Sequence, residues 1–522
     1  MWCHGSSHID RRCHFRNVCY NPKADAFVFF RHLNSVLSGV PKDRFSPTLL
    51  EWSSVADHNR LFFNYVDAPA SEARRVLHEH VYVTDTVFSF KRVLADDLMH
   101  IIHDDLLPAF VTLRHICKQT SGPFPVQLLF MDTYARGPYW SLYASLTDVP
   151  PMIKSDLHSK SLTCFHDLHV GISKETLWYD HGFKEPQTPL VNSSVDAFTI
   201  TQFTNYLRAS LNVNSASRVT PHKKSAVLLV RRQSRVILNE AAVVSELTSL
   251  QFDVSVVAAE SAVLREAIER ISGASLIVAL HDPLLILAMF APAHTLLLEC
   301  FPYALKPDNY VMYKTLAQLP GVNLTYASWR NMHEERSLTH PTRDWRHGGI
   351  EHLPPAVQLR VRTSPEVPRH KCCYEPQYMY RLYQDTAIDV SDIRHIITSH
   401  FNDTSATSRS SDVLQDLLHS QMPPGPVLTP VCRPMLGETH PLLRINWEHP
   451  LNWRLVPHDY ILYEVVLQEA GSQEVLKWSA RRNHLQVMSS IQPKKRYFVW
   501  VRALFNDALA GPFNTDEVLC VT

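Results

Sequence analysis

Four polar side chains of the kinds that bind a nucleotide follow successive apolar runs in the middle of the chain. Arg231 and Arg235 come after the first of these runs, His281 after a later one, and Glu299 after the last. An arginine fork neutralises a diphosphate, and a histidine can donate hydrogen bonds to the same oxygens. A carboxylate can accept hydrogen bonds from both hydroxyls of a ribose. We therefore interpret Arg231, Arg235, His281 and Glu299 as binding residues for a nucleoside diphosphate.

A purely structural interpretation of the same residues stays open. The two arginines would then lie in a solvated loop between a strand and a helix, and His281 would cap a helix. The convergence of all four on one edge of a sheet favours the binding interpretation. The chain contains neither a GxGxxG motif nor a Walker loop, which disfavours a dinucleotide dehydrogenase and a P-loop ATPase.

A second polar cluster lies nearer the N-terminus, in the run Asp97-Leu-Met-His100-Ile-Ile-His103-Asp104. On a helix, His100, His103 and Asp104 share one face. We interpret His103, Asp104 and His100 as catalytic residues that act as a general base or position the acceptor. Metal ligation is the weaker alternative, because the pattern lacks the i, i+4 histidine pair of HExxH enzymes, and we predict no metal site. A helix N-terminus capped by Asp96 is the structural alternative.

The elements that must position the first set are predicted from alternating apolar runs and helical patterns. We expect strands at 226–230, 253–258, 275–280 and 295–298 and helices at 240–250, 262–271 and 284–290. This alternation predicts a parallel, doubly wound sheet with right-handed crossovers. Ligands bind beyond the carboxyl ends of such strands, where the four side chains are expected to fall.

The N-terminal part is less regular but also predicts an α/β lobe. We expect strands at 26–30 and 126–130 and helices at 97–107 and 199–211. The predicted fold class is therefore α/β, with two Rossmann-like lobes and a cleft between them. We place the N-terminal, acceptor-side lobe at 1–215 and the C-terminal, nucleotide-side lobe at 216–400.

The last part of the chain has a different pattern. Residues 401–427 are polar and then proline-rich, which predicts a linker. Short alternating strands follow in 428–522, and they predict an all-β sandwich. We expect three of these strands at 443–447, 460–468 and 497–504.

This C-terminal segment resembles a fibronectin type III domain. The run around Tyr497 matches the corner at which a tyrosine hydroxyl bonds back to the backbone, and Trp447 matches the core tryptophan. Cys432 and Cys520 bracket the segment. Cysteines at the two ends of a domain are well placed to form a disulfide in an oxidising compartment, and we predict one between these two.

Composition limits the partners and the compartment. Lysine plus arginine equals aspartate plus glutamate at 51 each, so no net field draws the chain to nucleic acid or anionic lipid. Ten cysteines, together with Asn-X-Ser/Thr triplets at Asn192, Asn323 and Asn402, indicate a secretory protein. No run of about 18 apolar residues is present. We therefore expect an exported protein whose targeting or anchoring segment is missing from this chain.

The two polar clusters and the stretches around them resemble glycosyltransferase family 61. The resemblance is carried by the runs 97–108, 231–240, 299–308, 313–317 and 367–370 and extends over nearly the whole chain. It implies an inverting GT-B enzyme that moves N-acetylglucosamine from UDP-GlcNAc to the 4-hydroxyl of O-linked mannose on a protein. UDP-GlcNAc would be the donor substrate, held in the lobe with Arg231, and no metal or other cofactor is expected to be obligatory.

The same resemblance implies a location and an acceptor. The location is the lumen of the endoplasmic reticulum, and the acceptor is a dystroglycan-like O-mannosylated protein. A homodimer stays open. Two other functions are weighed against the transferase: a catalytically impaired relative that binds O-mannosylated protein, and an interaction protein that works through its fibronectin domain.

The donor-site run departs from the family pattern. The family has His-Gly-Ala, whereas this chain has His281-Asp282-Pro283. Proline removes an amide donor, and an inward Asp282 would repel a phosphate, which favours the impaired relative. We expect a reversion of the pair to Gly-Ala to raise UDP-sugar affinity with little change in stability, as for an ordinary loop position. The first cluster departs too, with Asp97 in place of the family's asparagine.

Overall fold

A computed structural model describes the chain except for residues 6, 9, 32–43, 45, 56–61, 70, 72–79, 120–121, 158–161, 181–187, 190–194, 196, 214–223, 260–263, 372–374, 403–422, 437–440, 451, 454–460, 473, 489 and 506–508. The chain forms two compact units, Met1–Thr398 and Ser399–Thr522. The predicted lobe boundary at 215/216 and most of the predicted linker 401–427 lie outside the described residues.

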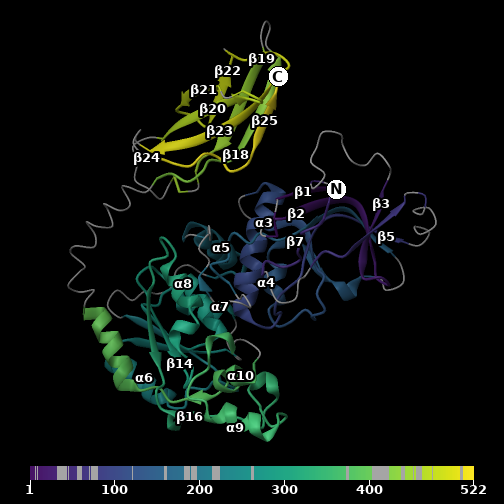
Figure 1. Ribbon diagram of the computed structural model, residues 1–522. Helices are drawn as coiled ribbons and strands as arrows, with labels where there is room; N and C mark the ends of the chain where they lie inside the picture. Colours follow the sequence, from purple (N-terminus) through teal and green to yellow (C-terminus); the bar gives the residue numbers. More distant parts are fainter. Residues whose placement is uncertain are drawn as a thin grey trace. The chain divides into compact units, whose positions relative to one another are not determined.

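The second half of the first unit contains the predicted parallel sheet (Figure 1). Its strand order is β12-β11-β13-β14-β15, and each neighbouring pair is parallel. The strands are β11 (Ser225–Val230), β12 (Asp253–Ala258), β13 (Leu276–Leu280), β14 (Leu296–Phe301) and β15 (Thr325–Arg330). Every residue of β13 and β14 is buried, as expected for a parallel sheet that is covered on both faces.

The helices that connect these strands follow the predicted pattern. They are α6 (Glu240–Ser249), α7 (Leu264–Ile271), the 3-10 helix η4 (Pro283–Phe290) and α8 (Met312–Gln318). Helix α7 buries Ala267, Ile268 and Ile271, the apolar stripe of an amphipathic helix, against the sheet core. The elements that follow are η5 (Pro307–Asn309), η6 (Glu334–Arg336), η7 (Trp345–His347), α9 (Pro355–Thr363), η8 (Arg369–Lys371), α10 (Pro376–Leu382), the pair β16 (Ser337–Leu338) and β17 (Asp385–Thr386), and a helix over 390–402.

The N-terminal sheet is mixed, so the expected Rossmann-like pattern is found only in part. Its order is β4-β3-β2-β8-β5-β6-β7, with β1 paired to β2. Strands β8, β5, β6 and β7 run parallel, whereas β2 is antiparallel to β1, β3 and β8. The strands are β1 (Trp2–His4), β2 (Arg12–Asn21), β3 (Ala26–Arg31), β4 (Tyr65–Pro69), β5 (His80–Phe90), β6 (Phe124–Phe130), β7 (Thr147–Ile153) and β8 (Leu162–Val170).

The helices of this half join the two sheets through one hydrophobic core. Helix α5 (Ala197–Ser210) packs against η4, and Arg208 on α5 donates a hydrogen bond to the carbonyl oxygen of Phe290 at 2.6 Å. One cluster of buried residues contains Phe110, Phe203 and Leu285 together. Because α5 is shared in this way, the two sheets belong to one compact unit.

The predicted helix 97–107 is longer and irregular. It consists of α2 (Leu98–His100), a π-helical segment η2 (Ile101–Leu106) and α3 (Leu107–Cys117). All six residues of η2 are buried. π-Helical turns are rare, and those that do occur inside α-helices are often found at functional sites. This one contains His103 and Asp104. The remaining short elements of this half are α4 (Trp140–Ala144), η3 (Lys154–Asp156), β9 (Tyr179–Asp180) and β10 (Thr188–Pro189).

The second unit starts with the end of the helix over 390–402, and its described residues from Leu428 onward form two antiparallel sheets (Figure 1). One sheet has the order β18-β19-β22, and the other has β21-β20-β23-β24 with β25 paired to β23. The strands are β18 (Leu428–Leu436), β19 (Pro441–Glu448), β20 (Ile461–Glu469), β21 (Val475–Ala480), β22 (His484–Val487), β23 (Arg496–Phe505), β24 (Leu509–Ala510) and β25 (Val518–Val521). Trp447 and Tyr497 are buried in the core between them.

Disulfides tie strands together in both units. The predicted Cys432–Cys520 bond is confirmed, and it links β18 to β25. Cys3–Cys13 links β1 to β2, and Cys19–Cys164 links β2 to β8. Three disulfides among the described residues suit an oxidising compartment. Among the described residues, no helix is both long enough and apolar enough to cross a membrane.

Candidate active site

Arg231 and Arg235 converge on one carboxylate at the carboxyl end of the parallel sheet. Arg231 follows β11, and its Nε and Nη2 donate to the two oxygens of Asp282, the second at 3.3 Å. Arg235 Nη1 lies 3.5 Å from Asp282 Oδ2. The prediction that these arginines meet at one sheet edge is therefore confirmed in geometry. Asp282, which both arginines contact, is also a position at which this chain departs from the family pattern.

Asp282 is a buried and structurally engaged residue, not a loop position facing solvent. Its Oδ1 caps η4 by accepting the amide hydrogen of Leu284 at 2.9 Å, and only 6% of the residue is exposed. Burial disfavours its charged form, but the charges of Arg235 and Arg231 outweigh burial and lower its pKa. The carboxylate is thus ionised and neutralised by the two arginines. These contacts predict that substitutions here would change stability, in contrast to the expectation for an ordinary loop position.

His281 and Glu299 form a buried pair beside the arginines. His281 Nδ1 lies 2.5 Å from Glu299 Oε1, and Tyr326 donates its hydroxyl hydrogen to Glu299 Oε2 at 2.6 Å. Glu299 is fully buried. The strand was expected to end at residue 298, but β14 continues to Phe301 because Glu299 to Phe301 pair with β15. Glu299 therefore lies inside the strand, and in this conformation its oxygens hold His281 and Tyr326.

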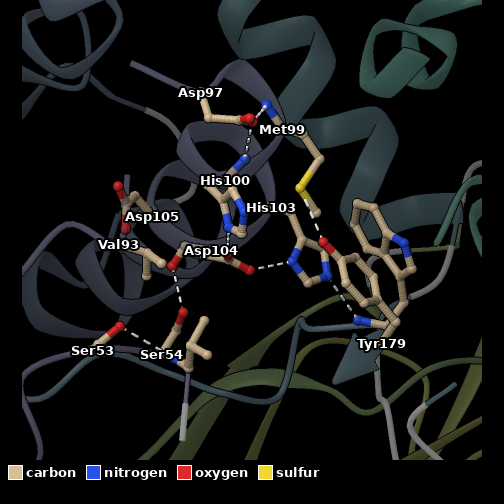
Figure 2. Close-up of polar contacts among 12 residues, drawn as sticks. Ser53, Ser54, Val93, Asp97, Met99, His100, His103, Asp104, Asp105 and Tyr179 are labelled. Atoms are coloured by element: carbon tan, nitrogen blue, oxygen red, sulfur yellow. Dashed lines mark hydrogen bonds and ion pairs between the residues drawn. The ribbon is translucent and has the colours of Figure 1, made fainter. Parts of the chain in front are cut away.

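The first predicted cluster is assembled around Asp104. Figure 2 shows Asp104 between two imidazoles: His100 Nδ1 lies 2.6 Å from its Oδ2, and His103 Nδ1 contacts its Oδ1. The three side chains meet as predicted from their spacing. The cap of this helix is Asp97, not Asp96, because the Asp97 side chain accepts the amide hydrogens of Met99 and His100.

His100 and His103 have different environments. His103 is fully buried, its Nε2 accepts the amide hydrogen of Trp178 at 3.2 Å, and its ring stacks on Tyr179. With Nε2 as an acceptor, Nδ1 is the donor to Asp104, which defines a neutral tautomer. His100 keeps 19% of its side chain exposed. Burial opposes its protonation, but the hydrogen bond to Asp104 and the nearby carboxylates raise its pKa to about 9.

The two clusters are linked by helix α8 and Trp178. Trp178, whose amide binds His103, also donates its indole hydrogen to the carbonyl oxygen of Met312 at 3.1 Å. The next residue, Tyr313, donates its hydroxyl hydrogen to the carbonyl oxygen of Asp282 at 2.8 Å. A short chain of hydrogen bonds therefore connects the Asp104 cluster to the Asp282 cluster.

Electrostatic coupling shows that the two clusters are neighbours. Burial is the largest cause that raises the pKa of Tyr139, and the charges of Arg231, Asp97 and Asp282 act on the same hydroxyl. Burial also raises the pKa of Tyr313, on which Glu299, Asp97 and Asp282 act. Charges from both halves of the unit therefore act on the same two tyrosines, so the two clusters lie near each other.

Sequence reasoning missed the residues that support the cluster. Tyr326 and Trp178 were not considered, and Tyr313 was noted only as part of a resemblance. Asp105 was missed as well: burial raises its pKa well above the usual range, and Tyr143 donates a hydrogen bond to it at 2.6 Å. The only local signal for Asp105 was its place beside Asp104, directly before the apolar Leu106-Leu107.

The Asp104 cluster does not have the form of a metal site. Both ring nitrogens of His103 are already engaged, because Nδ1 contacts Asp104 and Nε2 accepts the amide hydrogen of Trp178. Among the described residues, the only group of three or more ligand atoms near enough to hold an ion is elsewhere, on β2 and β8.

This combination of a parallel sheet, paired arginines and a buried histidine–carboxylate cluster has a counterpart among known proteins. The family described as Glycosyltransferase 61 matches residues 98–298, a range that includes both clusters up to the residue before Glu299. The chain belongs to the glycosyltransferase 61 family, because it is also similar over its whole length to curated proteins of one kind.

Those proteins are named protein O-linked-mannose beta-1,4-N-acetylglucosaminyltransferase 2. The chain is 37% identical to the one from Mus musculus over 527 residues, covering 100% of this chain and 89% of that protein. It is 35% identical to the one from Takifugu rubripes over 536 residues, with the same coverage. Among solved structures, the FN5 domain of Drosophila Lar is 20% identical and covers 19% of this chain and 96% of that chain, with a TM-score of 0.15 that decides nothing about the fold.

Proposed function

We propose that this protein transfers N-acetylglucosamine from UDP-GlcNAc to the 4-hydroxyl of O-linked mannose on a protein, with inversion, as an enzyme of GT-B type. Whole-length similarity to relatives named as O-mannose β-1,4-N-acetylglucosaminyltransferases supports the reaction. The observation that carries the proposal on this chain's own residues is Arg235. Its side chain is 8% exposed, and its buried Nε has no hydrogen-bond partner among the described residues.

A buried charged donor without an acceptor is costly, so it points to a ligand that would supply one. The ligand must carry anionic oxygens, and it must approach the carboxyl end of β11, where a parallel sheet binds ligands. The diphosphate of UDP-GlcNAc meets both requirements. We assign Arg231 and Arg235 to the diphosphate, with Asp282 orienting both guanidinium groups before the donor arrives.

His281 and Glu299 have a related but different assignment. His281 is the donor-site histidine, and Glu299 holds its Nδ1 and so orients the ring. The predicted contact of Glu299 with the ribose hydroxyls would require Tyr326 or His281 to leave its carboxylate. We therefore propose Glu299 as a positioning residue and His281 as the residue that contacts the nucleotide.

The acceptor reaction is assigned to the Asp104 cluster. In one displacement the mannose O4 attacks C1 of the sugar, the bond from C1 to UDP breaks, and the hydroxyl proton moves to a base. We propose His100 as that base, because it is the partly exposed histidine of the cluster. Asp104 orients His100 and stabilises its protonated form, and His103 holds Asp104. The arginines stabilise the departing UDP, and no metal is expected in this step.

The binding-module alternative rested on Asp282 and Pro283. Because Arg231 and Arg235 offset the charge of Asp282, that argument loses its force. We retain a fibronectin type III assignment for the second unit, supported by the bond from the Gln492 amide to the Tyr497 hydroxyl. We also propose the lumen of the endoplasmic reticulum as the location, supported by the disulfides, and a dystroglycan-like acceptor.

A transfer assay tests the proposal directly. The protein is incubated with UDP-GlcNAc and either an O-mannosyl peptide or the same peptide without mannose, and products are identified by mass spectrometry. Only the mannosylated peptide should gain N-acetylglucosamine. His100→Gln should lower kcat by about 100-fold or more, the range for a general base, and should leave UDP affinity unchanged. The exposed His395→Gln is the matched control. Binding of the mannosylated peptide without any transfer would favour the binding module.

A further inference from the structure

Three side chains far from each other in the sequence meet on one face of the N-terminal sheet. His14 on β2 and His169 on β8 are direct partners in the antiparallel register. Asp167 lies two positions before His169, so its side chain falls on the same face of β8. The ligand atoms of these three side chains all lie within 4.8 Å of one another. None of them belongs to the candidate active site.

The donor atoms of this trio lie close together. The two imidazole rings are stacked, with centroids 4.2 Å apart and planes 2° from parallel. His14 Nε2 contacts Asp167 Oδ1, and His169 Nε2 lies 3.8 Å from the same oxygen. The Nε2 atoms of both histidines therefore lie near one carboxylate oxygen.

A residue on a third strand fixes the orientation of the Asp167 carboxylate. Thr86 on β5 donates its hydroxyl hydrogen to Asp167 Oδ2 at 3.3 Å, which leaves Oδ1 directed at the histidines. A second residue that orients a ligating carboxylate is typical of metal sites. The trio is also reachable from solvent, because between 21% and 31% of each side chain is exposed.

We propose that His14, Asp167 and His169 form a binding site for a divalent transition-metal ion, and that Zn²⁺ is the ion it takes. Two imidazoles and one carboxylate are a common Zn²⁺ ligand set, which leaves a fourth position for water. Tetrahedral Zn²⁺ with bonds of about 2.1 Å needs ligand atoms about 3.4 Å apart. To complete the site, the two stacked rings must rotate out of their parallel arrangement so that both nitrogens point at the ion.

Two arginines of β2 lie on the same face of the strand as His14. Arg12 is directed to His115, with its Nη1 3.2 Å from the His115 Nδ1, and the exposed Arg16 lies opposite Asp167 in the register.

The site would connect the two strands that are already joined by the Cys19–Cys164 disulfide. The metal would thus stabilise the pairing of β2 and β8 at a second point. Because an ion that binds only the folded state raises its stability, metal binding should raise the melting temperature.

Zinc titration of the full chain, after removal of metal with a chelator, tests the proposal. Calorimetry and elemental analysis after dialysis should find one tight equivalent of Zn²⁺. In His169→Ala and in the nearly isosteric Asp167→Asn, affinity for that equivalent should fall by at least about tenfold, the lower end of the range typical of residues that only orient a ligand. Arg16→Gln should keep or tighten the site, because it removes a nearby cation.

The control variant is His166→Ala, which changes an exposed histidine of the same strand outside the trio. It should keep the tight equivalent and the zinc-dependent rise in melting temperature. Circular dichroism without metal verifies that each variant is folded. The proposal is overturned if the wild-type chain binds no Zn²⁺ tightly, or if the folded Asp167→Asn variant binds it as tightly as His166→Ala does.

Discussion

The guanidinium of Arg231 donates two hydrogen bonds to the carboxylate of Asp282, one from Nε to Oδ2 and one from Nη2 to Oδ1 at 3.3 Å. Arg235 approaches the same carboxylate from a second position. A residue that would repel a phosphate by itself therefore holds two cations at the edge of the sheet. Its charge is offset, but an incoming diphosphate must share the arginines with it.

Reversion of Asp282-Pro283 to Gly-Ala should destabilise the protein, in contrast to what a loop position would show. The double change removes the cap of η4 and leaves Arg231 and Arg235 without their carboxylate. A lost cap costs about 0.5–2 kcal/mol, and an uncompensated buried charge adds to this cost. Urea unfolding measures the change.

UDP should partly reverse this effect, because its diphosphate can replace the missing carboxylate. The variant should therefore gain more stability from UDP than the original chain does. Equal stability of the two proteins without UDP would show that the contacts of Asp282 contribute little.

Arg235→Ala should weaken UDP binding by about 1.5–3 kcal/mol, the range for a hydrogen bond to a charged group. The reason is that Arg235 brings a buried, partly unsatisfied guanidinium to the end of β11. Isothermal titration calorimetry with UDP measures the change. Arg265→Ala, which removes an exposed arginine paired with Glu269 on α7, is the control. Unchanged UDP affinity in Arg235→Ala would reject the diphosphate assignment.

Stability should fall as the pH rises between about 6.5 and about 9, and His100 should be responsible. Its folded pKa is raised to about 9, above the value of about 6.5 in an unfolded chain. Stability from such a group is fully present below the unfolded pKa and is lost as the pH rises through the folded one. Urea unfolding at about pH 6 and about pH 10 measures the difference. In His100→Gln this difference should shrink, and a variant with the original pH dependence would contradict the assignment.

The transfer rate should show the opposite trend with pH. A base must be unprotonated to accept the proton of the mannose hydroxyl, and the Asp104 hydrogen bond keeps His100 protonated at neutral pH. We therefore expect kcat/KM to rise with pH up to about 9. A profile that is flat between about pH 6 and about pH 9 would assign proton transfer to another residue.

Tyr497→Phe should loosen the second unit. The Tyr497 hydroxyl oxygen accepts the amide hydrogen of Gln492 at 3.0 Å, at the corner before β23. Loss of one such bond costs about 1 kcal/mol. Hydrogen exchange of the β23 amides, followed by mass spectrometry of the full chain, should become faster. Exchange at the original rate would show that the corner bond is not needed for the stability of this sheet.

Much of the fold was determined by local sequence pattern. The strand–helix alternation predicted the parallel sheet that the structure shows between residues 225 and 301. This prediction was possible because the spacing of apolar residues that distinguishes a strand from a helix can be recognised within a short stretch of sequence. The same holds for the strands of the second unit and for the Cys432–Cys520 bond, whose cysteines lie on the first and last of these strands. The meeting of His100, His103 and Asp104 was also predicted, because it depends on spacing within one helix.

What only the tertiary structure decided involves partners that are distant in the chain. Asp282 caps a helix and pairs with an arginine, and these contacts depend on burial. Glu299 lies within a strand and accepts a hydrogen bond from Tyr326, because the pairing of β14 with β15 places it there. His103 differs from His100 because the backbone amide of Trp178 donates its hydrogen to His103 Nε2. His14 and His169 are 155 positions apart and meet only through the register of β2 with β8. Local spacing does not predict such pairings, because the register between distant strands is set by the packing of whole strands against a common core.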